Sequence, residues 1–126
     1  MPLVKSFIDK KMNISYYTLD PKDEILKIKS EFLKAKYLGF KFISYIRFSL
    51  IEAEYLLSTT PNIGTPGYPY QKPKLVKNLV HIFHSISDIS IYRKGSLDHY
   101  DSVILVGEFQ RKSIIELENK RGLKQK

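Results

Sequence analysis

Cysteine is absent from this chain of 126 residues. Its absence excludes disulfide bonds, thiolate zinc sites, iron–sulfur clusters and cysteine nucleophiles, and it fits a reducing compartment. Long apolar runs are absent as well, because none approaches the ~18–20 residues that cross a bilayer. Residues 1–13 also lack the apolar segment and cleavage site of a secretory signal. We therefore expect a soluble, cytoplasmic protein without a membrane partner.

The sequence also lacks the motifs of common catalytic chemistry. It has no glycine-rich phosphate loop, no serine in a nucleophile elbow and no HExxH motif. His81, His84 and Asp88 are spaced for one helical face, but the apolar residues between them favour a plain helix edge over a metal site. The acids around residues 103–106 have the layout of a metal-dependent nuclease, yet Gln110 replaces the lysine expected there. We expect no catalytic residue, metal or cofactor, so an enzyme is the least favoured class.

What the chain does contain is sufficient for a core. Hydrophobic residues make up 43% of it, with 7 Phe and 9 Tyr. Burial of these side chains can offset the conformational entropy of folding. The length is usual for one domain, and no linker or repeat divides the sequence. We expect residues 1–126 to form a single domain.

Positive charge is the most informative property of the composition. Lys and Arg number 21 against 13 Asp and Glu, a net charge of +8. Residues 1–63 carry +3 of this charge and residues 64–126 carry +5. Such an excess favours polyanionic partners, nucleic acid before membrane, through long-range attraction and counterion release. The alternative is a lysine-rich surface that is merely solvated.

The first part of the chain predicts a hairpin and a helix. Residues 13–19 are rich in β-branched and aromatic residues and predict a strand, with which residues 3–8 would pair. Asp20 then precedes Pro21, which is typical of a helix start. Apolar residues recur at helical spacing from there to Gly39, where we expect this helix to end.

The middle of the chain predicts two central helices separated by a loop. Apolar residues over 42–57 follow a 3-4-3-4 spacing, although alternating phenylalanines leave a strand over 40–47 open. Residues 58–74 hold four of the six prolines and predict a Pro/Gly-rich loop. Residues 75–89 then resume helical spacing.

The last part predicts two strands and a helix. Residues 89–92 and 103–106 are apolar and β-branched, with a turn between them. An amphipathic helix follows, and residues 122–126 are expected to fray into a basic tail. The predicted fold class is therefore α+β, with a small, mainly antiparallel sheet, two central packed helices and a C-terminal helix.

Two basic segments are candidates for nucleic-acid contact. The loop over 67–74 combines two tyrosines, which can stack on bases, with lysines that can meet phosphates; covering of the core by the tyrosines is an equal alternative. The basic side chains of the C-terminal segment would contact phosphates, which gives affinity without sequence specificity. The alternative is that they form a solvated helix face. The predicted nucleic-acid-binding residues are Tyr68, Tyr70, Lys72, Lys74, Lys77, Arg93, Arg111, Lys112, Arg121 and Lys124.

The run from Glu52 to Ile63, EAEYLLSTTPNI, fits the pattern E-x4-L-S-x3-N-I. It resembles the TPRKB/Cgi-type subunit of the KEOPS complex, in which a helix carrying the glutamate ends at Leu-Ser and Asn-Ile leads to a second helix. Residues 12–17 with the helix after them, and the strand over 101–106, are similar to further family elements. An extra stretch over residues 64–74 departs from the family pattern.

The resemblance implies a non-catalytic subunit that binds the kinase subunit of KEOPS. It also implies recruitment of tRNA by its acceptor 3′ end, for threonylcarbamoyl adenosine modification by another subunit. The two central helices are the favoured packing element for a protein partner. The predicted partner-binding residues are Ile43, Ile46, Leu50, Ile82 and Ile86.

The leading hypothesis is therefore a non-catalytic tRNA- or RNA-binding accessory subunit. A small basic protein of a virus or mobile element, which binds DNA or a host protein, is the second hypothesis. The third is a structural interaction subunit, including a homo-oligomer, in which the charge only maintains solubility.

Overall fold

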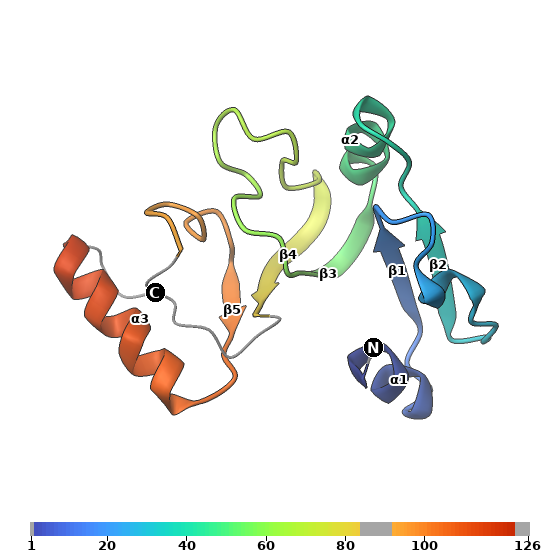
Figure 1. Cartoon of the computed structure of the whole chain (residues 1–126), viewed down its shortest axis with the longest axis horizontal. Helices are drawn as coiled ribbons and strands as arrows, with labels where there is room; N and C mark the ends of the chain where they lie inside the picture. Colours follow the sequence, from blue (N-terminus) through green and yellow to red (C-terminus); the bar gives the residue numbers. More distant parts are fainter. Residues whose placement is uncertain (1, 84–91, 123–126) are drawn as a thin grey trace. The chain divides into compact units, whose positions relative to one another are not determined.

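The computed structural model describes residues 2–83 and 92–122 (Figure 1). In chain order the elements are α1 (Pro2–Asp9), β1 (Ile14–Thr18), the 3-10 helix η1 (Glu24–Lys27), β2 (Leu33–Tyr37), α2 (Phe42–Ser49), β3 (Glu52–Ser58), β4 (Leu75–Ile82), β5 (Ser102–Ile104) and α3 (Glu108–Arg121). They fall into two compact units, residues 1–48 and 49–126, each of which is described by itself. Within the described residues, no helix has the length and apolar character needed to cross a membrane.

The first unit is built on two parallel strands. β1 and β2 pair in register from Ile14 opposite Leu33 to Thr18 opposite Tyr37. Side chains from α1, η1 and both strands make the small core, namely Val4, Ile25 and Leu33, with Ile8, Ile14, Tyr16 and Ala35 packed against them. Lys34 and Lys36 alternate with the core residues of β2 and are exposed, so the opposite face of this strand is basic.

At the start of this unit one prediction is confirmed and one is wrong. β1 lies within the strand predicted over residues 13–19. Residues 3–8 belong to the helix α1 and do not pair with β1 as a strand. Pro2 suits the first helical position, and the helix turns Val4 into the core.

The helix predicted between Pro21 and Gly39 is also wrong. Asp23 caps only the short η1, where its carboxylate accepts a hydrogen bond from the Ile25 amide at 2.9 Å. Residues 33–37 form β2, because their alternation of apolar and basic side chains suits a strand with one buried face. Pairing with β1 overrides the helical spacing that the sequence also contains.

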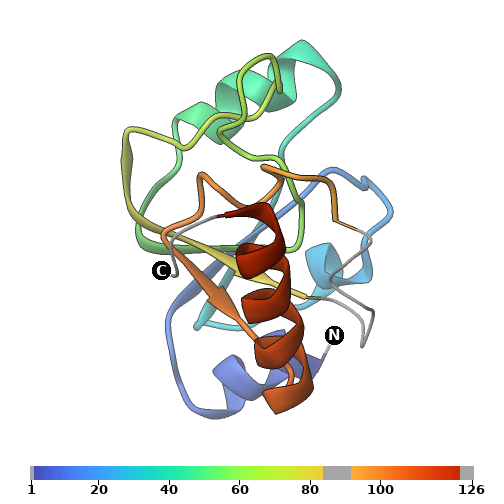
Figure 2. The ribbon, with the colours of Figure 1, turned by 90° about the vertical axis from the view of Figure 1, so that its left-hand side faces the viewer.

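The second unit is a three-stranded parallel sheet in the order β3-β4-β5. β4 is the central strand, paired with β3 from Leu75 opposite Glu52 to His81 opposite Ser58, and with β5 over residues 80–82. Its buried side chains join others in the core of this unit, which comprises Ile51, Ile63, Val76, Leu79, Val80, His81, Phe83 and Tyr100. Figure 2, which looks from the α3 side, shows α3 in front of β4 and β5.

Of the two central helices predicted for the middle of the chain, the first is confirmed only over residues 42–49, where the alternative strand over 40–47 is wrong, and the second is wrong over residues 75–82. α2 ends at Ser49, and the second half of the predicted helix over 42–57 forms β3. β4 replaces the start of the helix predicted over 75–89. Because a central parallel strand can be buried on both faces, its apolar residues cluster without alternation and imitate helical spacing.

The rest of this unit agrees better with the sequence. Residues 59–74 connect β3 to β4 as an irregular loop, and α3 ends at Gly122 in a left-handed conformation (φ +65°). β5 confirms the first half of the strand predicted over 103–106. Most of the strand predicted over 89–92 and nearly all of the basic tail lie outside the described residues.

The fold class is α+β, but the mainly antiparallel sheet is a wrong prediction. Every strand pair that the described residues form is parallel. Parallel neighbours need a crossover of a dozen or more residues, whereas the prediction assumed short hairpin turns. The connections between paired strands, over residues 19–32, 59–74 and 83–101, are long enough for such crossovers.

Candidate nucleic-acid interface

The Pro/Gly-rich loop over residues 59–74 is fixed against the chain that precedes β5. The Asn62 amide donates a hydrogen bond to the Ser96 carbonyl at 2.8 Å. Gly64 has a positive φ of +86°, and a Cβ at this position would lie 2.7 Å from the Cβ of His99. The loop therefore has a defined shape at this contact, and only glycine allows the close approach.

The two tyrosines predicted to stack on bases pack within this loop. The ring centroids of Tyr68 and Tyr70 lie 6.0 Å apart, with a tilt of 54° between the planes. Gln71 Nε2 donates to the carbonyls of Tyr68 (2.6 Å) and Thr65 (3.0 Å), which closes the turn beneath them. Both rings are half-buried, so part of each is used in packing.

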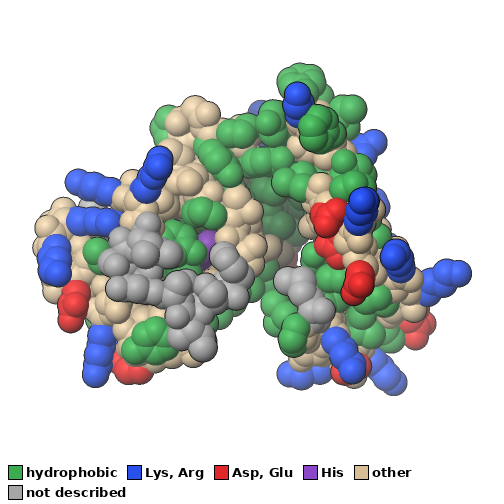
Figure 3. Space-filling view, viewed as in Figure 1, with side chains coloured by type: hydrophobic (Ala, Val, Ile, Leu, Met, Phe, Trp, Pro, Cys, Tyr) green, Lys and Arg blue, Asp and Glu red, His purple; other side chains and the backbone are tan. Residues whose placement is uncertain are grey.

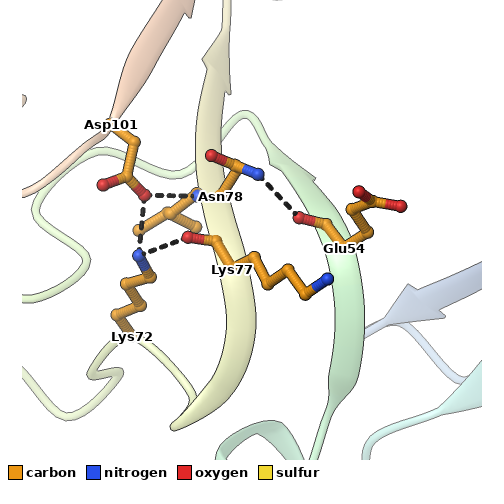
Figure 4. Close-up of polar contacts among 6 residues, drawn as sticks. Glu54, Lys72, Lys77, Asn78 and Asp101 are labelled. Carbon is orange, nitrogen blue, oxygen red and sulfur yellow. Dashed lines mark hydrogen bonds and ion pairs between the residues drawn. The ribbon is translucent and has the colours of Figure 1, made fainter.

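Lys72, predicted to contact phosphate, instead forms an ion pair and a hydrogen bond within the second unit (Figure 4). Its Nζ lies 2.8 Å from Asp101 Oδ2 and 2.9 Å from the Lys77 carbonyl oxygen. The same carboxylate oxygen accepts a hydrogen bond from the Leu79 amide at 2.7 Å, and the Asp101 amide donates to the Leu79 carbonyl at 2.9 Å. Asp101 thus continues the hydrogen bonding of β4 beyond the end of β5. The ion pair of Lys72 with Asp101 holds the end of the loop against this strand.

The C-terminal turn of α3 brings one predicted cation, Arg121, to the chain just before a second, Arg93. Arg121 Nη2 donates a hydrogen bond to the Tyr92 carbonyl at 3.3 Å. The Arg121 side chain therefore reaches the backbone next to Arg93 and Lys94, which follow Tyr92 along the chain, and Lys120 precedes Arg121 in the last turn of α3. We call these four cations the helix-end cluster. Figure 3 shows Lys and Arg side chains gathered over this part of the second unit.

The remaining predicted cations of the second unit are spread out. Lys74, Lys77 and Lys112 are exposed, and Lys124 lies outside the described residues. Arg111 forms an exposed ion pair with Glu108 at 3.2 Å. An exposed pair of this kind is weak, so the guanidinium can still exchange its partner for a phosphate.

Few of the Lys and Arg side chains that the structure describes have an acidic partner. Among the described Lys and Arg side chains, Lys72 and Arg111 alone have a carboxylate within ion-pair distance. All ten Lys and Arg residues of the first unit are exposed. The surface therefore presents most of its positive charge to solvent.

Sequence reasoning overlooked the cations of the first unit. The chain between Glu31 and Glu52 holds no Asp or Glu, yet it contains Lys34, Lys36, Lys41 and Arg47. This local run of uncompensated charge was the available signal, and the smaller net charge of residues 1–63 concealed it.

The predicted partner-binding residues do not form one packing element. Ile43, Ile46 and Leu50 are 54%, 46% and 71% exposed, at and just after α2. Ile82 is half-buried at the end of the strand β4, and Ile86 lies outside the described residues. The helix pair expected to carry all five is absent from the described chain, because β3 and β4 occupy its place.

The histidine considered as a metal ligand lies in an aromatic cluster. His81 is fully buried, and its ring makes edge contacts with Phe83, Tyr92 and Tyr100 at centroid distances of 4.8, 5.8 and 5.1 Å. Burial raises the pKa of Tyr100 to about 12. No group of three or more His, Asp or Glu in the described chain is placed to hold a metal ion; His84 falls outside that part.

Comparisons with known proteins give no relative. No protein-family model, no curated protein and no solved structure matches this chain. Its function has to be argued from its own residues.

Proposed function

We propose that this protein is a non-catalytic, RNA-binding accessory subunit. The observation that carries the proposal is the excess of cations without carboxylate partners: of the described Lys and Arg side chains, two are in ion pairs, against a net charge of +8. Uncompensated cations on a surface attract polyanions at long range and release counterions on binding. The helix-end cluster joins cations from two segments of the second unit, and Arg93, Lys94 and Lys120 in it are exposed, so we assign phosphate contact to it first.

The narrower proposal is a tRNA-recruiting subunit of the KEOPS kind, in the cytoplasm and with a kinase partner. The resemblance of residues 52–63 supports it. The strand β3 occupies the place where the resemblance implies a helix bearing Glu52. The resemblance therefore supports the narrower proposal through the sequence pattern alone. RNA binding itself does not depend on this resemblance.

The experiment is a binding titration with intact tRNA, tRNA without its 3′ CCA, and duplex DNA, at about 50 mM and about 200 mM salt. We expect tRNA to bind, with affinity falling as salt rises. Selective loss of affinity without CCA would support the KEOPS-like role. Preference for the duplex would favour the DNA-binding alternative, and absence of binding to all three would favour a structural subunit.

A charge-reversal variant tests the assigned surface. Replacing Arg93, Lys94 and Lys120 of the helix-end cluster by Glu should weaken tRNA binding more than the same change at Lys22, Lys27 and Lys29 of the first unit. The two variants change the net charge equally. An equal loss in both would mean that net charge, and not this cluster, determines the affinity.

A further inference from the structure

The chain between β2 and α2 presents two phenylalanine rings to solvent. Phe40 and Phe42 are each 70% exposed. Lys41 lies between them, and its Nζ is 5.3 Å from the centroid of the Phe40 ring. We call these three residues the Phe–Lys–Phe tip. Large apolar side chains exposed together are typical of binding surfaces, because water disfavours them.

The backbone of this tip is fixed in advance. Gly39 has a φ of +100°, and a Cβ there would lie 2.9 Å from Ile43 Cγ2. Lys41 also adopts a left-handed conformation, with φ +46°. Its carbonyl accepts hydrogen bonds from the Ser44 amide (3.0 Å) and the Ser44 hydroxyl (2.5 Å), which tie the tip to the first turn of α2. Little entropy is lost when a ligand binds to a surface that is already ordered.

The surroundings of the tip are positively charged. No acidic residue occurs between Glu31 and Glu52. Arg47 is exposed, and its Nη1 lies 3.4 and 3.5 Å from the carbonyls of Tyr37 and Leu38, just before the tip. The ligand that fits must therefore combine an apolar face with negative charge.

We propose that the Phe–Lys–Phe tip binds single-stranded nucleic acid, with a base stacked on Phe40 or Phe42 and a neighbouring phosphate on Lys41. This inference rests on the proposed function and adds a preference for unpaired bases. A nucleotide joins a flat base to a phosphate over a short distance, which matches an aromatic ring with an ammonium group beside it. A second copy of this chain would instead bring like charges together. A duplex keeps its base faces stacked and offers only its phosphates.

The test compares a labelled single-stranded oligouridylate with an RNA duplex of the same length, about 12 nucleotides and within the usual single-strand site sizes. Replacing both phenylalanines by Ala should weaken single-strand binding by at least about fivefold, the loss of one stacked base, and leave duplex binding unchanged. Replacing both by Leu should weaken it similarly, because Leu keeps the apolar bulk but has no ring face. Phe109→Ala is the matched control, since Phe109 is 48% exposed on α3.

The other outcomes separate this inference from the proposed function. If the unchanged protein binds neither RNA, both fail. If it binds RNA and the two Ala replacements leave single-strand binding intact, the tip assignment fails while RNA binding stands. If the Leu variant binds RNA as the unchanged protein does, and the tip is instead needed for cosedimentation with phosphatidylglycerol vesicles, the tip serves an anionic lipid surface and the inference is overturned.

Discussion

The two units of this protein use positive charge differently. The first, residues 1–48, has ten Lys and Arg against five Asp and Glu; all ten cations are exposed, none of the described ones is in an ion pair, and Arg47 donates to the carbonyls of Tyr37 and Leu38. The second, residues 49–126, has 11 against eight. Within its described part, Lys72 joins the loop to Asp101, Arg111 pairs with Glu108, and Arg121 bonds to a main-chain carbonyl.

The difference shows that a lysine in a sequence does not indicate by itself whether it serves the fold or a ligand. Lys72 belongs to a segment rich in aromatic and basic residues, yet its ammonium has two partners within the unit. Lys41 was not selected from the sequence, yet it stands beside an exposed ring without a carboxylate partner in the described structure. The experiments below test whether the cations that stabilise the fold and the cations that bind a ligand are different residues.

The largest expected effect concerns the two cores. Leu79→Ala in the second unit and Leu33→Ala in the first should each lower the free energy of unfolding by about 2–5 kcal/mol, because both side chains are buried. Hydrogen exchange should show lost protection over residues 52–82 for Leu79→Ala and over 14–37 for Leu33→Ala. An equal loss over both ranges in each variant would mean that the chain unfolds as one cooperative body.

The next effect concerns the carboxylate that Lys72 holds. Asp101→Ala should lower the free energy of unfolding by about 1–3 kcal/mol, because the Leu79 amide loses its acceptor. Glu108→Ala is the matched control, since it removes only the exposed pair with Arg111 and should cost at most about 0.5 kcal/mol. Urea unfolding of the two variants measures both. Equal destabilisation would contradict the structural role of the Lys72–Asp101 pair.

A smaller effect concerns a tyrosine of the first unit. The Tyr16 hydroxyl donates a hydrogen bond to Asp23 Oδ2 at 2.8 Å; burial, together with this bond, raises the Tyr16 pKa from 10.0 to about 12. The stability linked to the neutral hydroxyl is therefore full below pH 10 and is lost as pH rises towards 12. Tyr16→Phe should lose about 0.5–1.5 kcal/mol at neutral pH.

The pH dependence supplies the check on Tyr16. Urea unfolding at pH 9 and pH 11, values chosen about one unit either side of its ordinary pKa, should show a smaller loss in Tyr16→Phe than in the unchanged protein. Asp23 makes stability depend on pH in the opposite direction. The hydrogen bond from the Ile25 amide lowers the pKa of Asp23, so the stability that this carboxylate contributes is lost as pH falls through that pKa. Replacing Tyr100 by Phe offers the corresponding test in the second unit, where burial raises the pKa of that tyrosine to about 12. An unchanged alkaline loss in Tyr16→Phe would place the titrating group elsewhere.

Local sequence signals predicted the local features of this fold. Proline and glycine marked the loop over 59–74, and Gly122 marked the end of α3. The strand β2 also carried a signal, the alternation in LKAKY, which the competing helical spacing concealed. Parallel pairing depends on residues far apart in sequence, and a strand buried like β4 loses the alternation that would identify it.

For the candidate site, too, local sequence signals predicted only what depends on neighbouring residues. Composition predicted a basic surface, and Arg121 does reach the chain at Tyr92, next to Arg93. The engagement of Lys72 depends on an acid 29 residues away, which no local pattern indicates. The exposure of Phe40 and Phe42 depends on where α2 begins and which of its faces is buried. The sequence offered a helix over 42–57, which contains Phe42 alone, or a strand over 40–47, which contains both, and neither identified these rings as exposed.

The last prediction compares one cation from each unit directly. Lys41→Met should reduce the slope of log affinity for single-stranded RNA against log salt by about one, because one phosphate contact is lost. Lys72→Met removes the same charge but should leave that slope unchanged and lower the free energy of unfolding by under about 1 kcal/mol, since its partner is Asp101. Affinity measured over a salt series, with urea unfolding of both variants, separates the two roles. If Lys72→Met changes the slope as much as Lys41→Met, the ion pair opens for RNA, and the distinction between structural and ligand-binding cations fails at this residue.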